Sequence, residues 1–101
     1  KLEDFNGAIN DYTTAIELNP NEKHSYVGRG IALKGVQDYN GALKDLDKAV
    51  TLDPGYAKTY TLRGEVKFLN GDVAGACDDL LQAQKLGYMV AMASFNDYCE
   101  D

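Results

Sequence analysis

The chain repeats itself with a period of 34 residues, and this period limits the folds open to it more than any other feature. The segment 5–9 returns at 39–43 and, more faintly, at 73–77. Identical residues in one register are Asp4, Asp38 and Asp72, Asp11, Asp45 and Asp79, Ala15, Ala49 and Ala83, Leu18, Leu52 and Leu86, Pro20 and Pro54, and Arg29-Gly30 and Arg63-Gly64. Such a period indicates one supersecondary unit stacked on copies of itself. It favours a binding scaffold over a catalyst.

Apolar residues recur at helical spacing inside each unit. Between about 4 and 18, steps of three and four residues form one apolar stripe. Pro20 and Pro54 end helices, because the residue before a proline is pushed out of the α region. Asp38 is a favourable N-cap for the helix that follows it. The pattern predicts helices over about 4–18, 22–35, 39–52, 56–69 and 73–85.

The repeated positions resemble the tetratricopeptide repeat family. Its consensus places a large residue and then a glycine on a first helix. An alanine, an aromatic residue or leucine, and a second alanine follow on the second helix, with a proline after it. The matching residues are Ala8, Tyr12, Ala15 and Pro20, then Tyr26, Gly30, Leu33, Ala42, Leu46, Ala49 and Pro54, then Tyr60, Gly64, Ala76, Leu80 and Ala83. This chain departs from the consensus at Arg29, Arg63 and Lys67, and its last repeat lacks the proline.

The resemblance implies an all-α, right-handed solenoid of about two and a half repeats with a C-terminal capping helix. The second helix of a partial repeat would occupy 1–20, full repeats 21–54 and 55–87, and the capping helix 88–101. That last helix is expected to begin near Met89, with Tyr88, Met92, Phe95 and Cys99 on one face.

Composition narrows the classes of partner. A net charge of -6 argues against strong electrostatic binding to nucleic acid or to an anionic membrane. No apolar run is long enough to span a bilayer. Cys77 lies beside Ala76 on the inner stretch of a helix, so we expect a buried thiol. A disulfide with Cys99 is the alternative, and it would require an oxidising compartment.

Catalytic residues are not indicated. The single histidine, His24, has no pattern of Ser, Cys or paired carboxylates that makes a triad or dyad, and its place near a helix start predicts a solvated side chain. The glycines serve packing and turns rather than a phosphate-binding loop. No His/Cys cluster has the spacing of a metal site. We therefore expect no enzymatic activity, no metal and no cofactor.

Two arginines recur together with a repeated aspartate. Arg29 and Arg63 each precede the packing glycine, and second helices carry Asp11, Asp45 and Asp79 with the same period. We expect inter-helix ion pairs, with Arg29 reaching Asp11 or Asp45 and Arg63 reaching Asp45 or Asp79. The alternative is that both arginines are presented to an acidic ligand.

A binding groove is implied by the family resemblance, because first helices of successive repeats line a concave surface. The candidate groove residues are His24, Val27, Ile31 and Lys34 from one unit and Lys58, Thr61, Glu65 and Phe68 from the next. The apolar pair Val27 and Ile31 is expected to contact a ligand, with contact to an absent first helix or a neighbouring chain as the alternative. The lysines favour an acidic and apolar segment.

Chaperone tails are a known ligand class of such domains, held by Lys and Asn on one unit and by Lys and Arg on another. Here those positions read Val27 and Ile31, then Lys58 and Leu62. One of the four matches, which argues against binding of chaperone C-terminal tails.

The sequence therefore predicts a protein–protein interaction scaffold that takes a peptide or partner segment in the groove. The alternative is a structural or self-associating end of a longer array. In that case an open N-terminal side carrying Phe5, Ile9 and Tyr12 would make the contact.

Overall fold

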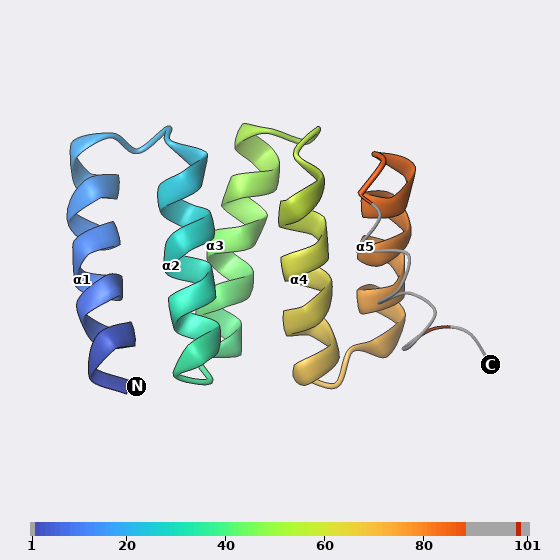
Figure 1. Cartoon of the computed structure of the whole chain (residues 1–101), viewed down its shortest axis with the longest axis horizontal. Coiled ribbons are helices and arrows are strands. Elements are labelled where there is room, and N and C mark those ends of the chain that lie inside the picture. The colour runs from blue at the N-terminus through green and yellow to red at the C-terminus, as the bar shows by residue number, and fades with distance from the viewer. Residues whose placement is uncertain (1, 89–98, 100–101) are drawn as a thin grey trace.

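The computed structural model describes residues 2–88 and Cys99, and its described part contains five α-helices. They are α1 (Leu2–Leu18), α2 (Lys23–Gly35), α3 (Tyr39–Leu52), α4 (Ala57–Leu69) and α5 (Val73–Lys85). The helices stand side by side in chain order, with α1 and α5 at opposite ends of the row (Figure 1). The expected all-α helical-repeat solenoid is confirmed. The expected capping helix falls outside the described residues, apart from Tyr88 and Cys99.

Local sequence explains where the helices begin and how the units are joined. The Asp38 carboxylate accepts a hydrogen bond from the Gly41 amide at 3.0 Å, and Asp72 accepts one from Gly75 at 2.9 Å. Each satisfies a backbone donor that the first helical turn leaves free. The loops after α1 and α3 are each held by a tyrosine hydroxyl of the next helix, which donates to the proline carbonyl. These bonds are Tyr26 to Pro20 at 2.8 Å and Tyr60 to Pro54 at 2.7 Å.

The core lies where small residues let the two helices of a unit approach closely. A Cβ at Gly30 would lie 3.1 Å from Cγ of Leu46, and one at Gly64 would lie 3.2 Å from Cγ of Leu80. Against these glycines the second helices supply Ala42, Leu46, Ala76 and Leu80, and they also bury Ala49 and Ala83. The packing of α2 on α3 therefore recurs in the packing of α4 on α5, as the period predicted.

Helix α1 packs on α2 through two aromatic rings seated over glycines. A Cβ at Gly28 would lie 2.5 Å from Cε1 of Tyr12, and one at Gly35 would lie 2.6 Å from Cζ of Phe5. Neither glycine has room for a side chain while the ring is in place. Phe5 and Tyr12, which we expected on an open N-terminal side, thus pack within the array, because the glycines of α2 leave room for their rings.

The contact of α3 with α4 fills the corresponding place with two leucines instead of an aromatic ring and a glycine. One period after Tyr12 and Gly28 stand Leu46 and Leu62, and Leu62 packs against the cluster of Ala42, Leu46 and Val66. The side-chain volume at this contact is thus divided differently between the two helices.

This exchange predicts a rescue. Gly28→Leu should lower the free energy of unfolding by about 1–3 kcal/mol, because the new side chain overpacks the Tyr12 ring. Adding Tyr12→Leu should recover most of that loss, since the pair then copies Leu62 and Leu46. Urea denaturation of the two single variants and the double variant measures the coupling. Losses that simply add would contradict the packing described.

Candidate functional site

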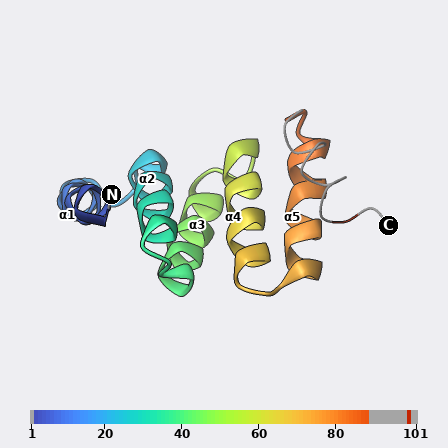
Figure 2. The same cartoon turned by 60° about the horizontal axis from the view of Figure 1, so that its bottom comes forward.

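The first helices α2 and α4 contact each other as well as their own partners, so they form the inner side of the array. Figure 2 shows α2 to α5 as successive neighbours, with α4 following α3 along the row. We call the surface of α2 and α4 that carries the accessible candidate residues the groove face. Its residues are His24, Ile31, Lys34, Lys58, Glu65 and Phe68.

Two of the eight candidate groove residues are not accessible. Val27 and Thr61 are each 5% exposed. Val27 belongs to a core cluster with Tyr26 and Ala49, against which Leu62 of α4 also packs. Val27 is buried where α2 approaches α4, so the expectation that Val27 contacts a ligand is wrong.

The remaining candidates place two apolar side chains, Ile31 and Phe68, among charged ones. Ile31 is 37% exposed on α2. One turn further, Lys34 reaches across to Glu65 of α4, with 3.6 Å between Nζ and Oε1. Lys58 is exposed on the first turn of α4, and Phe68 is half-buried near its end. The groove face therefore offers an apolar contact, a bridging ion pair and an exposed cation.

One edge of this face carries a cluster that the sequence did not reveal. The His24 ring meets Tyr56 edge to face, with 5.6 Å between the centroids. The Lys23 ammonium lies 4.1 Å above the centre of the Tyr56 ring and is also bonded to Asp53. The hydrogen bond from Lys23 holds the pKa of Asp53 below its usual value. Lys23 and Asp53 are 30 residues apart in the chain, and the packing of α2 on α3 brings them together.

On the opposite side of α2, the Arg29 guanidinium binds Asp45 with two hydrogen bonds. Nε lies 2.7 Å from Oδ2 and Nη2 lies 2.8 Å from Oδ1, while Nη1 donates to the Thr13 hydroxyl at 3.1 Å. The Asp45 side chain is 6% exposed. This hydrogen-bonded carboxylate raises the pKa of Arg29 above its already high usual value.

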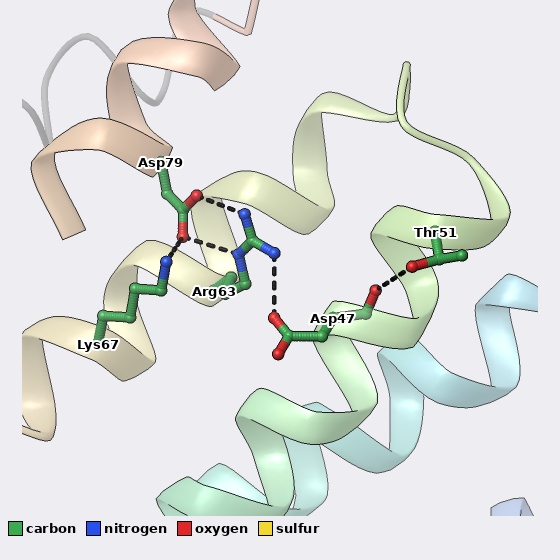
Figure 3. A network of polar contacts seen from close by, with 5 residues as sticks. All are labelled: Asp47, Thr51, Arg63, Lys67 and Asp79. Carbon is green, nitrogen blue, oxygen red and sulfur yellow. Dashed lines mark hydrogen bonds and ion pairs between the residues drawn. The ribbon is translucent and has the colours of Figure 1, made fainter. Parts of the chain in front are cut away.

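Arg63 makes the corresponding contacts one unit later, with a second aspartate in place of the threonine. It binds Asp79 at 2.9 and 2.8 Å, and its Nη1 donates to Asp47 of α3 at 3.0 Å. Lys67 adds a second cation, with its ammonium 3.0 Å from Oδ2 of Asp79. Figure 3 shows Arg63 between the two aspartates, with Lys67 one turn away. The hydrogen bonds to Asp79 raise the pKa of Arg63.

The structure thus places each arginine on the aspartate of its own unit. Asp45 takes Arg29 and Asp79 takes Arg63, whereas Asp11 is exposed on α1 and has no ion pair within the described residues. The suggested pairing of Arg29 with Asp11 is therefore wrong. Thr13, half a turn further along α1, lies nearer to the guanidinium.

The two cysteines are joined. The Cys77–Cys99 disulfide has a Cα–Cα distance of 5.7 Å, inside the range that such bonds require. The expectation of a buried thiol at Cys77 is wrong, because Cys99 lies close enough to bond with it. Across residues 2–88 and Cys99, no group of three or more His, Cys, Asp or Glu side chains is placed to hold a metal ion. No helix in that part of the chain has the length and apolar character needed to cross a membrane.

Several solved structures share this arrangement. The second TPR domain of human RPAP3, solved with an HSP70 peptide, is 25% identical, with a TM-score of 0.88 over 96% of this chain and 82% of that one. The TPR2B domain of yeast Sti1, solved in a complex with Hsp70, is also 25% identical, with a TM-score of 0.82 over 91% and 74%. MamA is 28% identical, with a TM-score of 0.86, and the match covers 95% of this chain but 57% of MamA.

No curated protein sequence matches the chain. The sequence model of the tetratricopeptide repeat, in contrast, matches residues 1–22 and 24–56, which is more than half of the chain. The matched region contains α1, α2 and α3, and the packing of α2 on α3 recurs in α4 and α5. The chain belongs to the tetratricopeptide repeat family.

Proposed function

We propose that this protein is an interaction scaffold that binds a segment of a protein partner on the groove face. The observation that carries the proposal is the exposed Ile31 beside the Lys34–Glu65 ion pair, which bridges α2 and α4. An apolar contact with a polar rim is the usual anatomy of a peptide-binding surface. The charged pair would orient the bound segment, and burial of its apolar side chain would supply affinity.

The charge of the groove face indicates the kind of segment. Lys58 is exposed and forms no ion pair within the described residues, although the molecule as a whole is acidic. A segment that combines an apolar side chain for Ile31 with a carboxylate for Lys58 suits this surface.

A chaperone C-terminal tail is the second candidate ligand. The matched domains of RPAP3 and Sti1 were solved with Hsp70 ligands, and each is 25% identical to this chain. That similarity gives no support to our sequence-based argument against such tails. The peptide seen with RPAP3, SGPTIEEVD, carries the acidic and apolar chemistry that the groove face favours.

The groove is tested by placing negative charge at two of its accessible residues. The variant Ile31→Asp/Lys58→Glu should lose binding by at least about tenfold while its circular dichroism stays that of the wild type. Titration calorimetry with SGPTIEEVD tests the chaperone tail, and mass spectrometry of proteins captured by wild type and variant identifies other ligands. Lys48→Glu on α3 makes the charge change of Lys58→Glu away from the groove face and should bind like the wild type.

The outcomes separate the candidate functions. A partner lost only with the groove variant supports the proposal, and loss of SGPTIEEVD binding in the same variant would make the chaperone tail the ligand. A partner retained by the variant contradicts it. Capture of this chain alone, with a mass that rises with concentration, would instead favour the self-associating alternative.

A further inference from the structure

A hollow lies between the second helices α1 and α3, on the other side of α2 from the groove face. Its volume is about 250 Å³. The lining residues are Ile9, Thr13, Arg29, Leu33, Gly41, Lys44 and Asp45. We call it the outer hollow. Small-molecule sites usually exceed about 300 Å³, so this hollow suits a single side chain better than a whole metabolite.

The polar floor of the outer hollow has more positive than negative charge. Arg29 uses Nε and Nη2 on Asp45, but the partner of Nη1 is the neutral hydroxyl of Thr13. That hydroxyl donates its own proton to the Ile9 carbonyl at 2.7 Å. Lys44 is exposed and forms no ion pair within the part of the chain that the structure describes. The outer hollow is therefore lined by two cations and one carboxylate.

The surroundings of Arg63 show the same place with a carboxylate for every cation. One period after Thr13 and Leu33 stand Asp47 and Lys67. Asp47 gives the arginine of that unit a second carboxylate at 3.0 Å, and Lys67 pairs with Asp79 (Figure 3). The charges of this network balance from within the chain. An external carboxylate can bind Arg29 as Asp47 binds Arg63.

We propose that the outer hollow binds an acidic side chain, a glutamate, of a protein partner. Its carboxylate would accept hydrogen bonds from Nη1 of Arg29 and from Lys44, which are the donors that the hollow leaves underused. Its methylene groups would lie against Ile9 and Leu33, which form the apolar wall. Charged hydrogen bonds to arginine are strong and directional, so the site selects a carboxylate over an amide. This is a second interaction surface, independent of the groove face.

The probe for this site is N-acetyl-glutamate α-amide, which carries one carboxylate on a glutamate side chain. Added to the isotope-labelled full chain, it should shift the backbone amide signals of Thr13, Leu33 and Lys44 in a saturable way. A dissociation constant on the order of millimolar suits so small a ligand. The glutamine analogue, which lacks the charge, should bind at least about tenfold more weakly.

Two variants and one control decide the result. Lys44→Glu should weaken binding about tenfold, because it replaces a cation of the hollow by an anion. Thr13→Asp/Leu33→Lys copies Asp47 and Lys67, so it should fill the hollow from within and abolish binding while urea denaturation shows a folded domain. Lys58→Glu on the groove face should leave probe binding unchanged, which separates this site from the proposed groove.

Equal binding of the two analogues, or full binding by either hollow variant, would overturn the proposal. So would probe-induced shifts that follow Lys58 on α4 instead of Lys44 on α3. If the copied pair proved unfolded, Lys44→Glu alone would still decide, because Lys44 is exposed and its replacement disturbs no packing.

Discussion

Replacing Arg29 by methionine is expected to lower the free energy of unfolding by about 3–5 kcal/mol, because it leaves a buried charge without a partner. The Asp45 side chain is 6% exposed, and Arg29 is the cation that binds both of its oxygens. Methionine keeps much of the apolar stem, so the loss reports the missing charge more than missing packing. Urea denaturation followed by circular dichroism measures the change.

The repeat supplies a matched comparison. Arg63→Met removes the corresponding arginine, but Lys67 still lies 3.0 Å from Asp79. The expected loss is therefore smaller, about 1–3 kcal/mol. Adding Asp45→Leu to Arg29→Met should restore part of the stability, since an apolar pair replaces the unpaired carboxylate. Equal losses for the two arginines, or no loss at all, would contradict this account of the ion pairs.

Removal of the disulfide is the other large expected effect. Cys77 and Cys99 are 22 residues apart, and closing a loop of that size stabilises a folded chain by about 3 kcal/mol through the entropy of the unfolded state. Cys99→Ser should lower the free energy of unfolding by that amount. Cys77→Ser should do the same, since each variant breaks the one bond.

Reduction gives the control for this prediction. Wild-type protein treated with dithiothreitol should unfold at the same urea concentration as Cys99→Ser, and the variant should not respond to the reductant. Two free thiols in the untreated wild type, found by thiol labelling and mass measurement, would contradict the bond.

Much of the fold could be predicted because short-range signals mark the ends of its helices. Pro20 and Pro54 follow α1 and α3, and Asp38 and Asp72 cap α3 and α5. The 34-residue period then predicts that the helical pairs stack on one another. It also indicated that each arginine has an aspartate partner, since two residue types that recur in one register occupy equivalent places.

The sequence could not predict which candidate residues stay accessible. Helical spacing shows that Val27 and Ile31 share a side of α2, but it does not show how near α4 comes to that side. The structure buries Val27 among Tyr26, Ala49 and Leu62 and leaves Ile31 exposed. This distance between helices depends on the sum of many side-chain volumes along the array, which no single spacing reveals.

The disulfide was missed as the preferred state for a related reason. After Leu86 the period breaks, so no register relates Cys99 to the preceding units. Without a register, the spacing of the two cysteines gives no distance between them.

The contact of Thr13 with Arg29 was missed because the hydroxyl has no counterpart of its type one period later, where Asp47 stands.

The two arginines also determine how local stability varies along the array. Each one links the second helices of neighbouring units, Arg29 through Thr13 and Asp45, and Arg63 through Asp47 and Asp79. The first junction ends on a neutral hydroxyl and the second on a carboxylate. In a repeat array, opening proceeds from the junction that is coupled least strongly to its neighbour. Thermal fraying should therefore start at α1 and spread toward α5, which gives the nearly symmetric solenoid a fixed direction of unfolding.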